Sequence, residues 1–149
     1  MTKPLLLFSL CFSLFFAEDT RAQAFEETTF EDITTTPSAS RSANFIDVNG
    51  DGWDDIFFTN GPAAGQNNML YLNNGDGSFT TVIADDIVLD NDRSDGASFA
   101  DVDNDGDLDA VVVTYGRNGT GKKNYFYRNN GNSTFTYEPD NAIGIPLTY

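Results

Sequence analysis

A stretch of about fifty residues occurs twice in this chain, and this repetition constrains the fold more than any other feature of the sequence. Residues 43–56 are echoed by residues 97–110, so that Asp47 corresponds to Asp101, 54 positions later. Residues 71–80 are echoed by residues 127–136, 56 positions later, and two residues are therefore inserted between the two matches. Self-similarity at a fixed spacing indicates two copies of one supersecondary unit.

Each copy contains four short β-rich runs that are separated by turn residues. The runs cover about residues 42–47, 55–59, 69–72 and 78–83 in the first copy, and 96–101, 109–114, 124–128 and 134–137 in the second. The Asn-Asn-Gly segments at 73–75 and 129–131 predict tight hairpins between the third and fourth runs. Residues 56–58 and 111–113 are apolar in succession, which is typical of strands covered on both faces. The sequence therefore predicts an all-β fold with two tandem four-stranded antiparallel β-propeller-type blades, a partial propeller.

The start of the chain has the pattern of a signal peptide. An apolar run at residues 5–17 follows Lys3 and is too short to span a bilayer comfortably. Ala22 and Ala24 are small residues at the two positions that a signal peptidase inspects, so we expect cleavage after Ala24, with Ala17 as the second choice. A retained membrane anchor is the alternative. The prediction is a signal peptide at residues 1–24 and a secreted, extracellular or periplasmic protein without membrane insertion after cleavage.

The remaining boundaries follow from the repeats. Residues 25–41 are expected to form a lead-in strand and a linker, because residues 29–33 resemble residues 78–82 and could close an incomplete earlier unit. Residues 42–140 hold the two repeats, at about 42–85 and 96–140. Residues 141–149 form a C-terminal tail without a clear pattern, and the start of a further blade is one interpretation.

Both copies carry an acidic loop with the pattern D-x-[DN]-x-D-G-x-x-D. Oxygen donors stand at positions one, three, five and nine, and the glycine at position six allows a sharp turn. Closely spaced oxygen ligands suit Ca²⁺ better than Mg²⁺ or softer metals, so we expect about two Ca²⁺ ions. The candidate ligands are Asp47, Asn49, Asp51, Asp55 and the backbone carbonyl of Trp53 in the first loop, and Asp101, Asp103, Asp105, Asp109 and the backbone carbonyl of Asp107 in the second.

The EF-hand begins with the same pattern, but two of its requirements are missing. Its loop needs a bidentate glutamate at position twelve, where this chain has Phe58 and Val112. Its loop also joins two helices, whereas these loops lead into β-branched and aromatic runs. A dockerin-like helical pair is disfavoured for the same second reason.

A calcium loop between two strands with its fourth carboxylate at position nine resembles the FG-GAP or VCBS repeats, which build integrin-alpha-type β-propeller blades. The resemblance covers about residues 43–137, and residues 45–47 and 99–101 stand where the family has its aromatic and acidic lead-in. Asn49 at position three and the small number of repeats depart from the family pattern. The resemblance implies an extracellular recognition or adhesion module that presents its loops to a protein or glycan ligand, with structural calcium.

Charge and composition narrow the alternatives. The chain has 8 Lys and Arg against 23 Asp and Glu, a formal net charge of −15 that disfavours nucleic acid and anionic membranes as partners. It contains no histidine, which removes the commonest general base and zinc ligand. We therefore predict that the chain is not an enzyme. The runner-up function is a non-catalytic fragment or accessory part of a larger propeller that assembles with further blades. A polysaccharide-active enzyme ranks last, because carboxylates that hold calcium cannot act as acid and base.

Three further expectations concern single segments. Trp53 is either an exposed platform for a ligand or, as we favour, packs over the neighbouring hairpin. The acidic residues at 85–86 and 90–92 lack the loop pattern and are expected in solvated connections. The second acidic loop has four side-chain carboxylates against three in the first, so we expect it to bind the ion more tightly.

Overall fold

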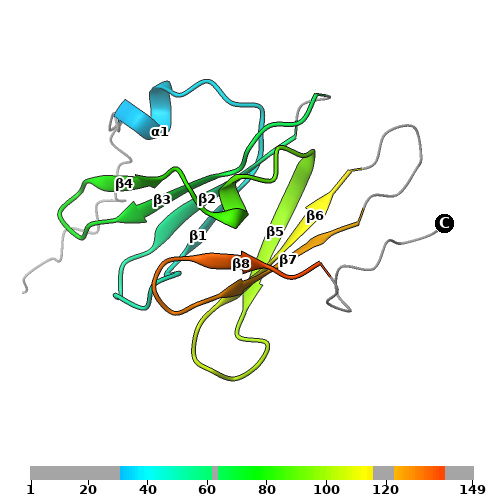
Figure 1. Cartoon of the computed structure of the whole chain (residues 1–149). Coiled ribbons are helices and arrows are strands. Elements are labelled where there is room, and N and C mark those ends of the chain that lie inside the picture. The colour runs from blue at the N-terminus through cyan, green and yellow to red at the C-terminus, as the bar shows by residue number, and fades with distance from the viewer. Residues whose placement is uncertain (1–30, 62–63, 116–122, 140–149) are drawn as a thin grey trace, which may run out of the picture.

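The chain folds into two four-stranded antiparallel sheets (Figure 1), in a computed structural model that describes residues 31–61, 64–115 and 123–139. The first sheet consists of β1 (Ser40–Ile46), β2 (Asp55–Asn60), β3 (Met69–Asn73) and β4 (Phe79–Val82), hydrogen-bonded in that order. The second consists of β5 (Ser94–Ala100), β6 (Asp109–Thr114), β7 (Tyr125–Asn129) and β8 (Phe135–Tyr137). The predicted all-β fold of two blade-like sheets in an open arrangement is confirmed.

The two sheets repeat each other down to the pairing of single residues. Phe45 pairs with Ile56 in the first sheet, and the equivalent Phe99 pairs with Ala110 in the second. Both first strands have a register shift near their start, between Ser40 and Ser42 and between Ser94 and Gly96. Residues that correspond in the sequence repeat therefore also occupy corresponding positions in the two sheets.

The Asn-Asn-Gly segments form the predicted hairpins. The amide of Asn74 donates to Ser78 O at 3.0 Å, and that of Asn130 donates to Thr134 O at 2.9 Å. The glycine of each segment has a positive φ, 73° at Gly75 and 71° at Gly131, which residues with a Cβ rarely adopt.

The main core lies between the two sheets. The rings of Phe57 from β2 and Phe99 from β5 meet edge to face with centroids 5.6 Å apart. Around them the buried cluster draws on both sheets and on the segment between them, and it comprises Val48, Phe57, Leu70, Ile87, Val88, Ala110, Val112, Tyr127 and Phe135. The expectation that β2 is covered on both faces is confirmed, since Ile56 and Phe57 are both buried. In β6, by contrast, Val112 faces the core but Val113 is exposed.

A short helix, not a strand, precedes the first sheet. The expected lead-in strand at residues 29–33 is wrong for its described part, because α1 (Glu31–Thr35) is helical. Its counterpart 54 positions later is the segment that contains the 3-10 helix η1 (Asp86–Val88), which precedes the second sheet. The backbone of a single strand needs a partner strand, whereas a helical turn satisfies its hydrogen bonds locally. Each sheet is thus preceded by the same kind of connection.

Several expectations fall on other parts of the chain. The signal peptide at 1–24, the rest of the lead-in at 25–30 and the tail at 141–149 lie outside the described residues. Within the described ranges, no helix has the length and apolar character needed to cross a membrane.

Truncation of a leucine in the core tests this architecture. We expect Leu70→Ala to lower the free energy of unfolding by about 2–5 kcal/mol, because Leu70 is fully buried between the sheets. The matched control is Leu89→Ala, since the side chain of Leu89 is more than half exposed. Urea unfolding of both variants measures the difference, and equal losses would contradict the proposed core.

Candidate functional site

Each acidic loop joins the first and second strands of its sheet. Residues 47–54 lie between β1 and β2, and residues 101–108 lie between β5 and β6. No helix flanks either loop, which excludes the EF-hand and dockerin arrangements. The two loops therefore occupy equivalent places at the ends of two neighbouring sheets.

The first aspartate of each loop holds the turn together through backbone amides. The Asp47 carboxylate accepts hydrogen bonds from Asp51 N at 3.1 Å and Gly52 N at 2.9 Å. The Asp101 carboxylate accepts equivalent bonds from Asp105 N at 3.2 Å and Gly106 N at 3.1 Å. Positive φ angles of 91° at Gly52 and 98° at Gly106 allow the backbone to turn its amides inward.

The three leading carboxylates of the second loop converge. One oxygen each of Asp101, Asp103 and Asp105 lies within 4.8 Å of the other two. Oxygens that share one Ca²⁺ at about 2.3–2.6 Å are at most about 5 Å apart, so this spacing fits a single hard cation. In the first loop Asn49 replaces the middle carboxylate, and its Nδ2 donates to Asp51 Oδ2 at 2.9 Å. The second loop therefore provides the more complete set of anionic oxygens.

The aspartate at position nine ties each loop to the third strand of its sheet. Asp55 Oδ2 accepts from Val48 N at 3.0 Å, and its Oδ1 accepts from Asn73 N at 2.7 Å. Asp109 is not part of the three-carboxylate cluster. Its Oδ2 accepts from Val102 N at 3.3 Å and its Oδ1 from Asn129 N at 2.9 Å. Both carboxylates are buried, so their hydrogen bonds have a structural role that the ligand pattern did not reveal.

Burial raises the pKa of Asp55 above its ordinary value, and the hydrogen bonds from Asn73 and Val48 oppose that rise. The nearby carboxylates of Asp51 and Asp47 add to it through their negative charge. Desolvation likewise raises the pKa of Asp103, the Arg128 guanidinium opposes the rise, and Asp105 adds to it. In both loops, neighbouring carboxylates therefore add to a rise in pKa that is caused mainly by desolvation.

The residue at position seven packs over the hairpin of its own sheet. A Cβ placed on Gly75 would lie 2.7 Å from Nε1 of Trp53, and one placed on Gly131 would lie 2.5 Å from Oδ2 of Asp107. The hypothesis that Trp53 packs over the neighbouring hairpin is confirmed, although 54% of the residue is exposed. Only glycine leaves room for this approach of loop and hairpin.

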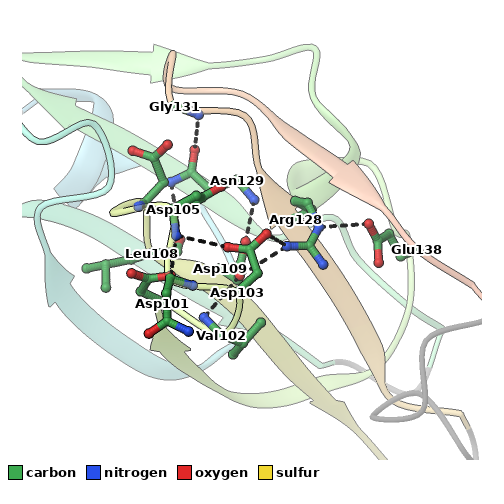
Figure 2. A network of polar contacts seen from close by, with 12 residues as sticks. Asp101, Val102, Asp103, Asp105, Leu108, Asp109, Arg128, Asn129, Gly131 and Glu138 are labelled. Carbon is green, nitrogen blue, oxygen red and sulfur yellow. Dashed lines mark hydrogen bonds and ion pairs between the residues drawn. The ribbon is translucent and has the colours of Figure 1, made fainter.

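Arg128 is the site residue that sequence reasoning missed. Figure 2 shows its guanidinium between the second acidic loop and the C-terminal side of β8. Nη1 donates to Asp103 Oδ2, Nε donates to Glu138 Oε1 at 2.8 Å, and Asp109 Oδ2 lies 3.8 Å away. The equivalent position of the first copy holds Leu72. This difference between the copies was the one sequence signal that could have pointed to Arg128 as a site residue. The second loop therefore has a counterion within the chain, and the first loop lacks one at this position.

The sequence predicts that the carboxylates in the connection between the sheets are solvated, but several of them bind other parts of the chain. Asp85 is buried and accepts from Phe135 N at 3.0 Å, while Asp86 accepts from Tyr137 N at 2.9 Å. Asp92 is also buried and accepts from the hydroxyl of Tyr125 at 2.8 Å. The expectation is wrong because these side chains bind β7 and β8, which lie far away in the sequence. Asp85 and Asp86 bond amides along β8, the edge strand of its sheet.

Comparison with known proteins agrees with this repeat geometry. Residues 47–112 match the model of a family described as FG-GAP-like repeat. This segment of the chain is similar to an FG-GAP-like repeat. The match runs from the first acidic loop through β2 to β5 and the second acidic loop into β6, and this similarity supports a propeller-type repeat in that part of the chain. No match to a curated protein or to a solved structure was found.

Two carboxylates in the connection between the sheets, one buried and one partly buried, predict an unusual pH dependence of stability. Desolvation raises the pKa of Asp85 and of Asp90 above the ordinary value of 3.8. The folded state then binds protons at a higher pH than the unfolded state, so these groups favour folding at low pH and lose that contribution as pH rises through the folded-state pKa.

We therefore expect the free energy of unfolding of the wild type to rise relative to that of Asp85→Asn as pH falls from 7 toward 4. Asp76→Asn serves as the opposite control, because a hydrogen bond from the Ser78 hydroxyl lowers the pKa of Asp76. Urea unfolding at several pH values with a chelator present measures both differences. A difference for Asp85→Asn that is independent of pH or moves the other way would contradict the assignment.

Proposed function

We propose that the two acidic loops each bind one Ca²⁺ ion and that the protein is a secreted, calcium-stabilised recognition or adhesion module. The observation that carries the calcium proposal is the convergence of the Asp101, Asp103 and Asp105 oxygens in a loop between two strands. The same loop occurs once in each sheet, and the FG-GAP-like repeat spans both occurrences.

Electrostatics support a divalent ion as the partner of these loops. Three carboxylates in one turn repel one another, and the net charge of −15 adds to the repulsion. Backbone amides of the loop offset part of it, and a bound Ca²⁺ would offset far more. Because the unfolded chain does not hold these oxygens together, the binding free energy would stabilise the folded state. The role proposed for calcium is therefore structural.

The proposed role beyond the loops is based on the composition and start of the sequence. A signal-peptide-like start, the absence of histidine and the acidic composition support an exported protein that presents its loops to a protein or glycan, with no catalytic activity. The carboxylates of Asp55 and Asp109 accept backbone hydrogen bonds, which makes them poor candidates for an acid and base pair. The second candidate is an accessory part of a larger propeller. The exposed Phe45 on the first sheet favours it, because a neighbouring blade would cover such a residue.

Calcium titration of the melting temperature tests the central proposal. We expect Ca²⁺ to raise the melting temperature, a chelator to reverse the rise, and Mg²⁺ at equal concentration to give a smaller one. In Asp101→Ala the rise should shrink more than in Asp47→Ala, since the second loop has more carboxylates. Differential scanning calorimetry measures all three proteins. A wild-type curve that does not respond to calcium or chelator would refute the proposal.

The ion pair between Arg128 and Asp103 should lower the affinity of the second loop for calcium. Calcium must compete with the guanidinium for Asp103, so Arg128→Leu, which installs the residue of the first copy, should raise the affinity. An exposed ion pair contributes about 0.2–1 kcal/mol, so the gain should reach up to about fivefold. Calorimetric titration in an Asp47→Ala background reports the second loop alone. An unchanged or weaker affinity would show that Arg128 does not compete with the ion.

A further inference from the structure

We infer that Asn49 is a site of spontaneous deamidation, which converts it to aspartate and gives the first acidic loop the same set of side-chain carboxylates as the second. Asn49 stands at position three of the first loop, where the second loop has Asp103. The next residue is Gly50, and an asparagine followed by glycine reacts most readily, because glycine has no side chain to hinder ring closure. The reactivity depends on the loop geometry alone, whereas its effect on calcium binding rests on the proposed function.

The reaction needs water but no enzyme and no cofactor. The main-chain nitrogen of Gly50 loses its proton to water or hydroxide and attacks Cγ of Asn49, so that a bond forms between this nitrogen and Cγ. Nδ2 takes up a proton and leaves as ammonia, and a succinimide ring remains. Water opens the ring at the side-chain carbonyl to give aspartate, or at the main-chain carbonyl to give isoaspartate. The reaction therefore requires a glycine amide that is available and a carboxamide that lies beside it.

The amide of Gly50 differs from those of the other glycines that follow an asparagine. In the other three such pairs within the described ranges, the glycine amide donates a hydrogen bond: Gly61 N to Ala39 O at 3.1 Å, Gly75 N to Asn73 Oδ1 at 3.0 Å and Gly131 N to Asn129 Oδ1 at 3.0 Å. The amide of Gly50 donates to no acceptor among the described residues. A donated hydrogen bond holds the proton on the nitrogen and fixes its direction, so Gly50 is the glycine whose nitrogen is available to attack.

The carboxamide of Asn49 lies along its own loop. Its Oδ1 accepts from Asp51 N at 3.0 Å, and its Nδ2 donates to Asp51 Oδ2 at 2.9 Å. These contacts place the side chain alongside Gly50, which lies between the two residues. The hydrogen bond to Oδ1 also polarises the carbonyl and makes Cγ a better target for the nitrogen. The carboxamides of Asn74 and Asn130 instead donate to hydroxyl groups across their hairpins.

The surroundings of the pair leave room for the ring and for water. Asn49 is partly exposed and Gly50 is exposed. Apart from the glycine and its chain neighbours, no atom of the described residues lies within 4 Å of a Cβ placed on Gly50. A Cβ placed on Gly61, Gly75 or Gly131 would meet another atom at 2.5, 2.7 or 2.5 Å. Those three pairs are therefore packed against other parts of the chain, whereas the pair in the first loop is open.

Conversion to aspartate changes the electrostatics of the first loop. Nδ2 of Asn49 donates to Asp51, whereas a carboxylate in its place would repel Asp51. The loop would then have carboxylates at positions one, three, five and nine, as the second loop has. In the second loop Arg128 pairs with Asp103, but the first copy has Leu72 at the position of the arginine. The converted loop would carry the added repulsion without that counterion, so it should bind calcium more tightly than the original loop.

Site-resolved mass spectrometry of the aged full chain tests the reaction. The folded protein is kept at mildly alkaline pH with a chelator, and peptide fragmentation follows the exchange of amide for acid at each asparagine. We expect Asn49 to react at least about fivefold faster than Asn60, Asn74 and Asn130, which is the factor that a net hydrogen bond contributes. In the denatured chain the four sites should react at similar rates, because each is followed by glycine and no fold protects them. A folded protein in which Asn49 reacts no faster than the other three would overturn the inference.

The matched control is Asn49→Gln, because the longer side chain would have to close a larger and slower ring. We expect no conversion at this position on the time scale of the wild type. Conversion at the wild-type rate would also overturn the inference, since attack by Gly50 N would then not be the route.

Calorimetric titration of Asn49→Asp tests the effect on calcium binding. The substitution supplies the aspartate product free of isoaspartate, and an Asp101→Ala background reports the first loop alone. We expect binding to be tighter than in Asp101→Ala by up to about fivefold, as for one exposed ion pair. Equal or weaker binding would overturn the stated effect on calcium. If the wild-type protein binds no calcium, the proposed function fails, and the mass spectra still decide whether Asn49 deamidates.

Discussion

The buried carboxylate at the ninth position of each acidic loop is the contact on which the rest of the structure depends. Asp55 and Asp109 each join the start of a loop to the end of the third strand of the same sheet. The loop is thereby held above the hairpin, where position seven can pack over a glycine. Because backbone amides stabilise both carboxylates, these two positions can remain buried while positions one, three and five of each loop are partly or fully exposed.

The sequence predicted the strands and loops well because both depend on local patterns. Turn residues lie at both ends of each short run, and the two copies show the same pattern of runs. Every strand was therefore predicted within about two residues of its position. Both loops lie between strands and not between helices. This agrees with the missing glutamate at position twelve, which disfavoured an EF-hand. The carboxylate cluster followed from spacing alone, since residues two apart in a tight turn bring their side chains together.

What the sequence could not provide are contacts between residues far apart along the chain. The burial of Asp85 depends on Phe135, fifty residues later, and no local pattern distinguishes such a carboxylate from a solvated one. Arg128 reaches Asp103 across the sheet in the same way. The short run at residues 29–33 resembled a strand in composition, but a strand also needs a partner, and the helical turn in α1 shows that its context decided. Equivalent positions in the two copies thus have different structures or contacts where the residues packed against them differ.

The central proposal is that the acidic loops bind a divalent cation. Amide chemical shifts during a calcium titration test it residue by residue, because Gly52 and Gly106 donate to the carboxylates that would turn to the ion. We expect saturable shifts of these two amides and their loop neighbours, with little change in the acidic connection at residues 85–92. Shifts centred on that connection, or no shifts in either loop, would contradict it.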